Sequence, residues 1–226
     1  MEEQHPRRHR EQNAWWWVMG PAVELVLCSA FRLRVAGAEH LPASGSAILA
    51  ANHVSALDPI VISVIPYRAG RTIRFLTAAE FFDKPLVGWA LKRYRQIPVR
   101  RGGADWEALR RTAAVIGDGT LAGIFPEGRV RHPGEPPLPG NKGAARVALA
   151  AGMPVVPVGV WGTQERFPRG GLRVRGDLRP SVAVVLRPPM GVGGDPRSRV
   201  DVRALTDRIM AEIGEAERKA RAMTRP

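Results

Sequence analysis

Short apolar runs alternate along the chain with longer segments in which apolar and polar residues are mixed. Short runs bounded by Gly, Pro and polar residues are typical of buried strands. We predict strands over residues 46–51, 73–76, 96–99, 121–125 and 155–160. Residues 182–186 are predicted to form an edge strand or a late strand.

The mixed segments between these runs have the features of helices. Residues 58–65 begin with Asp58 before Pro59, and Asp at a helix cap followed by Pro at the first helical position is a common start. Further helices are predicted over residues 86–94, 105–116, 142–151 and 200–222, and residues 77–82 lead into the first of these. Since strands alternate with helices, we predict an α/β fold: a single domain with a mixed, mostly parallel sheet flanked by helices.

Residues 14–31, AWWWVMGPAVELVLCSAF, form an apolar segment at the lower length limit for a bilayer span. Pro21 interrupts the helix ladder and Glu24 is costly in hydrocarbon, so a span is disfavoured. The tryptophans at positions 15–17, beside arginines at 7, 8 and 10, have the composition of an interfacial anchor. We predict that residues 1–31 form a basic tail and a membrane-associating, interfacial hydrophobic helix, and that residues 32–226 form the folded domain. A hydrophobic helix packed on that domain is the alternative.

Charge and cysteine content limit the classes of binding partner and the compartment that we expect. The 226 residues include 34 Lys plus Arg against 21 Asp plus Glu, a formal net charge of +13. Such an excess favours nucleic acid, anionic lipid headgroups or a phosphate-bearing substrate, or it reflects a solvated basic surface. No basic platform interleaved with aromatic residues is present, so nucleic acid is not expected. The single cysteine, Cys28, forms no disulfide within the chain, which fits a reducing compartment.

Histidine is scarce, and His53 stands out because it follows a predicted strand and precedes Asp58 by five residues. Five residues on a regular helix would not bring the two side chains to one face, but a loop that ends at the helix start can fold them together. An Asp bonded to one imidazole nitrogen fixes the tautomer and leaves the other nitrogen as a base. We predict no metal site, since no second His or Cys lies at ligand spacing.

A second polar cluster lies where the strand over residues 121–125 ends. Its members are Phe125, Pro126, Glu127, Gly128, Arg129 and Arg131. A third cluster, Arg100 and Arg101, follows the strand over residues 96–99. Ligands of α/β sheets bind beyond the carboxyl ends of strands, and Arg grips phosphate with a planar fork of donors. Taken alone, the second cluster is better explained as a surface turn with an ion pair.

The order and spacing of four motifs resemble those of the glycerolipid acyltransferases, in particular the lysophosphatidic acid (1-acyl-glycerol-3-phosphate) acyltransferase branch. The motifs are NHVSALD at 52–58, QIPVRR at 96–101, FPEG at 125–128 and VVPV at 155–158. The resemblance runs from about residue 41 to residue 163, over half the chain. It implies that the His-x4-Asp box of the family falls on His53 and Asp58. The arginine implicated in phosphate binding then falls on Arg101.

The resemblance implies an acyl transfer that needs no cofactor, no metal and no covalent enzyme intermediate. His53 would take the proton of the acceptor hydroxyl as that hydroxyl attacks a thioester carbonyl, and Asp58 would orient His53. Arg101, with Arg129 or Arg131, would hold the acceptor phosphate. Glu127 would position those arginines.

The resemblance also implies the partners of the reaction. The donor would be acyl-CoA or acyl carrier protein, and the acceptor would be a lysophospholipid. The enzyme would work as a peripheral or monotopic protein on the anionic surface of the cytoplasmic face of the cell membrane. The acyl chain needs an apolar groove, for which residues 60–65 and 86–91 are candidates.

One departure from the family pattern leaves the acceptor open. Family members usually continue Phe-Pro-Glu-Gly with Thr-Arg-Ser, whereas this chain has Arg129, Val130 and Arg131. The arginine is thus displaced by one position to either side. Another lysolipid or a glycolipid acceptor, or hydrolysis of a lipid ester or thioester with His53 acting on water, are the alternatives.

Overall fold

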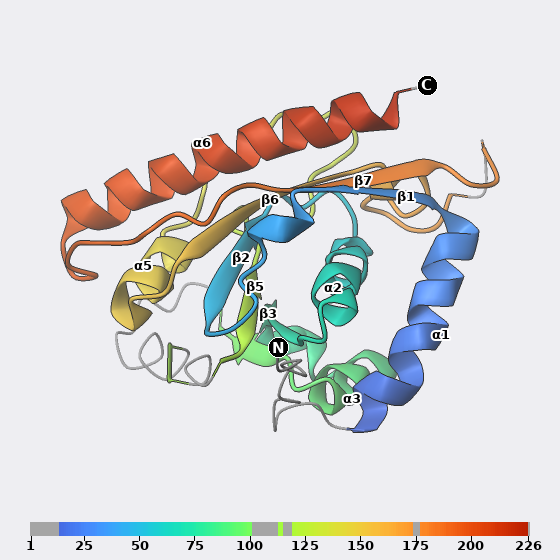
Figure 1. Cartoon of the computed structure of the whole chain (residues 1–226), viewed down its shortest axis with the longest axis horizontal. Coiled ribbons are helices and arrows are strands. Elements are labelled where there is room, and N and C mark those ends of the chain that lie inside the picture. Colours follow the sequence, from blue (N-terminus) through green and yellow to red (C-terminus); the bar gives the residue numbers. More distant parts are fainter. Residues whose placement is uncertain (1–13, 101–112, 115–118, 174–176, 226) are drawn as a thin grey trace, which may run out of the picture.

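The structure is a computed structural model that describes residues 14–100, 113–114, 119–173 and 177–225 (Figure 1). These residues form a seven-stranded sheet. Its strand order is β1 (Arg32–Ala36), β7 (Ser181–Leu186), β6 (Val155–Trp161), β2 (Ala47–Ala51), β5 (Leu121–Ile124), β3 (Ile73–Ala78) and β4 (Ile97–Val99). Neighbouring strands are parallel except β6 and β7, which are antiparallel. The predicted mixed, mostly parallel sheet is confirmed.

Helices cover both faces of this sheet. They are α1 (Ala14–Ala30), α2 (Asp58–Arg68), α3 (Pro85–Arg93), α5 (Gly143–Ala151) and α6 (Arg199–Thr224), with short 3-10 helices η1 (Ala38–His40), η2 (Ala79–Phe81) and η3 (Thr163–Glu165). Buried side chains of α1 and α2 pack on one face, and those of α5 and α6 pack on the other. Most of the predicted helix over residues 105–116 lies outside the described residues.

The central strand β2 shows why the sheet is buried on both sides. Its five residues are apolar and almost fully inaccessible. Side chains alternate between the faces of a strand, so Leu49 joins the core under α2 while Ile48 and Ala50 join the core under α5 and α6. A continuous apolar run is typical of a parallel strand covered by helices on both faces.

Residues 182–186 were predicted to form an edge strand or a late strand, and they belong to the last strand of the chain, which is not at an edge. β7 lies between β1 and β6, and β1 and β4 form the edges of the sheet. Val182 and Val184 of β7 pack into the core that contains α2, whereas Ala183 and Val185 pack against α6. A strand with apolar side chains on both faces needs cover on both, which an internal position gives it.

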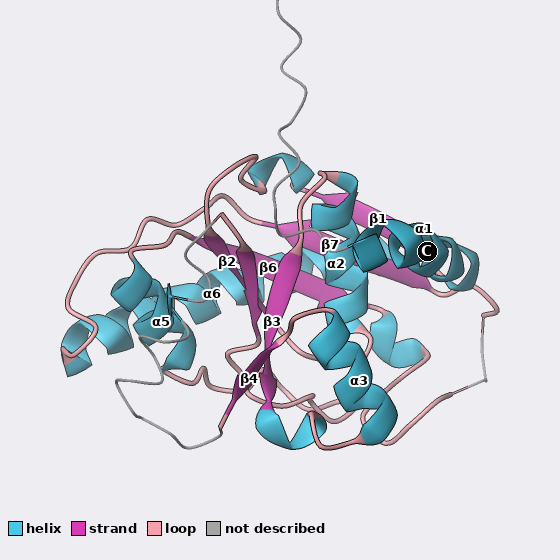
Figure 2. Cartoon of the chain, turned by 90° about the horizontal axis from the view of Figure 1, so that it is seen from below, coloured by secondary structure: helices cyan, strands magenta, loops and turns pink. Residues whose placement is uncertain are grey.

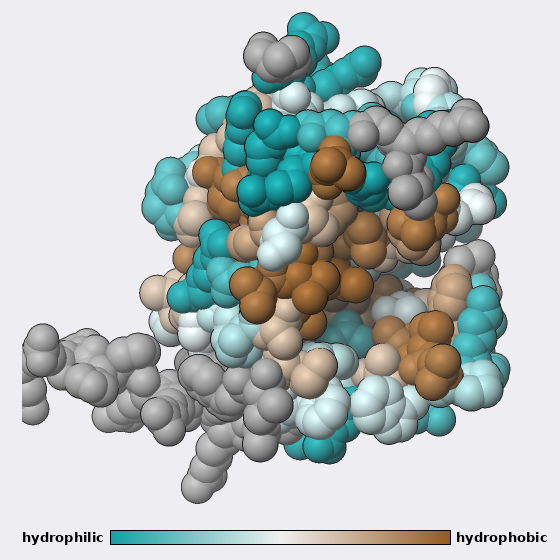
Figure 3. Space-filling view, turned by 90° about the vertical axis from the view of Figure 1, so that its right-hand side faces the viewer, coloured by the Kyte–Doolittle hydropathy of each residue, from teal (hydrophilic) through white to brown (hydrophobic). Residues whose placement is uncertain are grey.

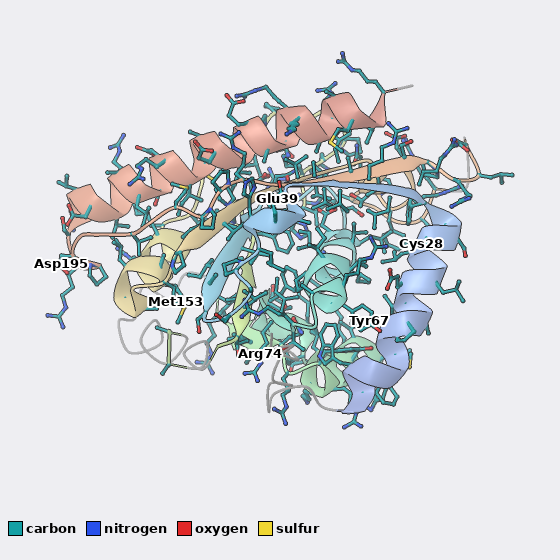
Figure 4. The ribbon with its side chains drawn as sticks, viewed as in Figure 1. Cys28, Glu39, Tyr67, Arg74, Met153 and Asp195 are labelled. Carbon is teal, nitrogen blue, oxygen red and sulfur yellow. The ribbon has the colours of Figure 1, made fainter. Side chains whose placement is uncertain are left out.

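Helix α1 packs along α2 and runs without a break through Pro21. Leu27 is buried in the core, and Tyr67 of α2 packs against Gly20 (Figure 4). The Nε of Arg68 donates to Glu24 across 2.7 Å, so the carboxyl inside the apolar segment has a cationic partner. The helix packed on the domain, given above as the alternative, therefore describes one side of α1. No helix in the described ranges combines the length and the apolar character that crossing a bilayer requires.

Three loops converge at the carboxyl ends of the central strands. β2 has parallel neighbours in β5 and β6, so all three strands end at the same edge of the sheet. His53 follows β2, Phe125 follows β5 and Thr163 follows β6. Figure 2 shows β2 and β6 between α5 and α1. The topology brings residues far apart in sequence to one place, where ligands of α/β sheets bind.

Candidate active site

The loop between β2 and α2 brings His53 and Asp58 together. The Nδ1 of His53 lies 3.0 Å from Oδ2 of Asp58. The His53 side chain is 15% exposed, whereas that of Asp58 is completely buried. Asp58 is the acceptor in this bond, so Nδ1 is the donor and Nε2 is left with its lone pair for a proton. The pair has the geometry of an oriented general base.

The Asp58 carboxylate is held by the backbone of its own loop. Its Oδ2 accepts from the amides of Val54 and Ser55 at 2.7 and 2.8 Å. The predicted position of Asp58 at the start of α2 is confirmed, although Leu57 is the N-cap residue and Asp58 is the first residue of the helix. The carboxylate turns back onto the loop because that loop supplies the donors. This turn is what closes the five-residue gap to His53.

Thr163 is a functional candidate that sequence reasoning missed. It opens η3 after β6 and is completely buried, and its hydroxyl donates to Oδ1 of Asp58 across 2.6 Å. Next to it, the Asn52 side-chain amide exchanges two hydrogen bonds with the backbone of Val160, at 2.9 and 2.7 Å. A single threonine has no sequence signature for this role. The loop after β2 is thus fastened to β6 at two points.

Aromatic rings support the imidazole from one side. The ring of Phe125 stacks on His53 with centroids 4.0 Å apart, and Phe75 continues the stack at 5.5 Å. Phe75 lies opposite Gly123 in the β3–β5 register. A Cβ on Gly123 would lie 2.3 Å from the Phe75 ring carbons, so only glycine leaves room for this ring. The stack fixes the plane of the His53 ring and contributes about 0.5–1.5 kcal/mol per ring pair.

The Phe-Pro-Glu-Gly motif forms a tight turn at the end of β5. The amide of Gly128 donates to the carbonyl of Phe125 at 3.0 Å, and Gly128 has a φ of 73°, which favours glycine. The Pro126 carbonyl accepts from the amide of Asn141 at 2.7 Å. This bond closes the loop over residues 127–140. The turn directs Glu127 inward.

Glu127 lies against the backbone of His53. It is 5% exposed, and its Oε1 accepts from the His53 amide across 3.4 Å. Its Oε2 lies 3.0 Å from Nε of Arg131, an ion pair without hydrogen-bond alignment. Burial raises the pKa of Glu127 to about 7, although the Arg131 guanidinium and the His53 amide favour the ionised form. A carboxyl with this pKa changes its charge near neutral pH.

Arg131 is part of the interior and not of an open binding surface. Its side chain is 4% exposed, and its guanidinium donates to Glu217 of α6 across 2.6 Å while pairing with Glu127. Its backbone amide donates to the His53 carbonyl at 2.9 Å. Two buried carboxylates flank the guanidinium, which argues against the prediction that Arg131 holds a phosphate.

Arg129 points to the other side of the same loop. Its guanidinium pairs with both oxygens of Glu135, one of them 2.9 Å from Nη1. The Glu135 carboxylate also accepts from the amide of His132 at 2.8 Å. These bonds lower the pKa of Glu135 to about 2. Unlike Arg131, the Arg129 side chain is one third exposed.

The other residues that the sequence predicted to contact the substrate differ in their exposure to solvent. Arg101 lies outside the described residues, while Arg100 is exposed after β4. In the candidate groove, residues 61, 62, 64 and 65 are buried in the core and only Ile60 is an exposed large apolar residue. On α3, by contrast, Leu86, Val87 and Trp89 face solvent. Among the residues that the structure describes, no three metal-ligating side chains lie close enough together to hold an ion.

The chain is similar in sequence to known acyltransferases. Residues 32–161 match a family model described as acyltransferase. A chloroplastic 1-acyl-sn-glycerol-3-phosphate acyltransferase of Brassica napus is 28% identical over 170 residues, which cover 73% of this chain and 47% of the relative. A 1-acyl-sn-glycerol-3-phosphate acyltransferase of Bacillus subtilis is 27% identical over 158 residues, covering 68% of this chain and 76% of the relative. The chain thus spans about half the length of the plant relative.

A solved structure shares the fold. The crystal structure of PlsC, the 1-acyl-sn-glycerophosphate acyltransferase of Thermotoga maritima, superposes with a TM-score of 0.62 at 20% sequence identity. The match covers 96% of this chain and 85% of that one. The α/β architecture described above is therefore shared along nearly the whole chain.

Proposed function

Because the chain belongs to the acyltransferase family, we propose that it transfers a fatty acyl group from a thioester to the free hydroxyl of 1-acyl-glycerol-3-phosphate. The observation that carries the proposal is the His53–Asp58 pair, 3.0 Å apart and partly open to solvent on the His53 side. The names of the Brassica napus and Bacillus subtilis relatives support the choice of acceptor. The donor is acyl-CoA or acyl carrier protein.

The chemistry follows from the orientation of the imidazole. Nε2 of His53 takes the proton of the acceptor hydroxyl as its oxygen attacks the thioester carbonyl. Asp58 holds the imidazole through Nδ1 and stabilises the imidazolium that forms. The tetrahedral intermediate then expels the thiolate, which recovers the proton from Nε2. The ester bond replaces the thioester bond, and the enzyme returns to its starting state.

The test is thiol release from acyl-CoA when 1-acyl-glycerol-3-phosphate is added, with an acyl carrier protein donor as the second arm. We expect acceptor-dependent release that falls about 10²–10⁴-fold in His53→Ala. His132→Ala, which removes an exposed histidine of the neighbouring loop, is the matched control and keeps the activity. Full activity in a folded His53→Ala variant would contradict the proposal. Release of free fatty acid without an acceptor would identify a hydrolase instead.

We further propose that α1 and α3 rest on the anionic cytoplasmic face of the cell membrane, in a peripheral or monotopic manner. The two helices are joined by edge-to-face contacts of Trp15 with Trp89 and of Trp16 with Tyr94. Leu25 of α1 is 69% exposed and Leu86 of α3 is 84% exposed. Figure 3 shows apolar side chains gathered on the face that carries α1.

Basic side chains lie beside this apolar surface. Lys84 precedes α3, Lys92 and Arg93 end it, and Arg95 follows. Tryptophans with basic residues around exposed apolar side chains suit the interface of an anionic bilayer. Co-sedimentation with phosphatidylglycerol vesicles should therefore exceed that with phosphatidylcholine vesicles and weaken as salt is raised. Equal binding to both vesicle types at all salt concentrations would show that the basic residues do not attract anionic lipid headgroups.

A further inference from the structure

The loop that follows β6 carries an arginine next to the proposed active site. Within this loop Thr163 bonds Asp58, and the Phe167 carbonyl accepts from the Ser55 hydroxyl at 2.7 Å. Two residues later, the exposed Arg169 donates from Nη1 to the carbonyl of Val130 at 3.2 Å. The loop is thus anchored to the His53–Asp58 loop at two points before Arg169. No carboxylate partner of Arg169 is found within the described ranges.

Arg129 reaches the same carbonyl. Its Nη1 lies 3.3 Å from the Val130 oxygen while it pairs with Glu135. Two guanidinium groups, Arg129 and Arg169, therefore converge on one atom. Like charges repel, and one carboxylate offsets only one of the two. The local balance favours a further anion.

The converging pair lies beside the backbone of His53. The carbonyl of Val130 and the amide of Arg131 belong to the same peptide, and that amide donates to the His53 carbonyl at 2.9 Å. In 1-acyl-glycerol-3-phosphate the free hydroxyl and the phosphate are on adjacent carbons. An anion held by the two guanidiniums therefore lies beside the loop that carries His53, and its free hydroxyl is on the next carbon atom.

We propose that Arg169 and Arg129 together bind the phosphate of the acceptor, and that Glu135 occupies Arg129 until the phosphate displaces it. The inference deepens the proposed function and rests on it for the identity of the acceptor. A phosphate monoester carries nearly two negative charges and matches two planar guanidiniums better than one carboxylate does. Glu135, once displaced, keeps its bond to the His132 amide. Arg169 is a binding residue outside the four sequence motifs.

The test compares kcat/KM for 1-acyl-glycerol-3-phosphate with kcat/KM for the phosphate-free 1-acylglycerol. In Arg169→Gln this ratio should fall about tenfold. Arg173→Gln, which removes the same charge further along the loop, is the matched control and should keep the ratio. In Glu135→Gln the ratio should rise several-fold, because a competing carboxylate is removed. A positioning role of Glu135 on Arg129 predicts the opposite sign.

Two outcomes overturn the inference. An Arg169→Gln ratio equal to that of Arg173→Gln removes Arg169 from the phosphate site. A lower ratio in Glu135→Gln shows that Glu135 does not compete with the phosphate for Arg129. If the native protein transfers no acyl group to either acceptor, the proposed function fails, and anion binding alone decides the inference. Glycerol 3-phosphate should then raise the Tm of the native protein and of Arg173→Gln but not that of Arg169→Gln, whereas an equal rise in all three would refute it.

Discussion

Around His53, buried polar side chains are held by specific partners, whereas along α1 and α3 large apolar side chains face solvent. Asp58 accepts four hydrogen bonds, and Arg131 lies between two carboxylates from distant segments. On the outer side of α1, Leu25 and Val26 are mostly exposed. Directional contacts make the first region sensitive to single atoms. Along α1 and α3, the exposed apolar side chains make no directional contacts, and only the amount of apolar surface matters. The fold should therefore tolerate substitutions there.

The largest effect on folding should come from Arg131→Gln. The substitution leaves Glu127 and Glu217 buried without their shared cation. We expect the free energy of unfolding in urea to fall by about 3–5 kcal/mol at neutral pH. Arg68→Gln is the matched control, because its pair with Glu24 is half-exposed and should cost less than about 1 kcal/mol. Equal losses in the two variants would show that the buried pair is not special.

The pH dependence of stability should reveal Glu127. Its pKa is about 7 in the folded protein and near 4.5 in the unfolded chain. The folded protein therefore holds this proton longer, and the associated stability is complete below pH 4.5 and is lost as pH rises through 7. The native protein should lose up to about 3 kcal/mol relative to Glu127→Gln between pH 4.5 and pH 7.5. A constant difference in unfolding free energy across this range would contradict the raised pKa.

A smaller effect is expected from Thr163→Val, which leaves Oδ1 of Asp58 without its buried donor. We expect a loss of about 1–3 kcal/mol in unfolding free energy and a lower kcat, with Thr163→Ser restoring both. Thr206→Val removes a buried hydroxyl that bonds only within α6, so it should leave kcat unchanged. If the two valine variants have the same kcat, Thr163 does not act through Asp58.

The smallest effect on folding is expected from substitutions on the exposed apolar side of α1. Replacing Leu25 and Val26 together by serine should change the free energy of unfolding by less than about 0.5 kcal/mol, since both side chains are exposed. Vesicle binding should nevertheless fall, because the surface proposed to enter the interface becomes polar. Val200→Ser removes an equally exposed apolar residue from α6 and should keep vesicle binding. Unchanged co-sedimentation of the double variant with vesicles would show that this side of α1 does not contact the membrane.

The sheet was largely predictable because its central strands are apolar on both faces. The runs at residues 46–51, 121–125 and 155–160 correspond closely to β2, β5 and β6. The place of β7 was not predictable, since strand neighbours depend on long-range pairing. β7 has parallel β1 on one side and antiparallel β6 on the other. No local pattern distinguishes such a strand from an edge strand with a similar sequence.

The site was predictable only in part. The spacing of His53 and Asp58 indicated a pair, and the loop between β2 and α2 brings them together. The two arginines beside Val130 look alike in sequence, yet one is buried and one is open. Their fates differ because the partner of Arg131 is Glu217, which comes 86 residues later. Contacts made by a distant helix leave no trace in a local motif.

The pairing of β1 with β7 also determines when β1 can join the sheet during synthesis. Arg32 and Ser181 are register partners, so β1 has no edge to join until most of the chain has been made. At about 5–20 residues per second the ribosome needs roughly 7–30 s to reach β7 after completing β1. During that interval the apolar segment before β1 lacks the strand that fixes its final position. Until β7 emerges, α2 can cover one side of this segment, but the core that Leu27 shares with β7 stays incomplete.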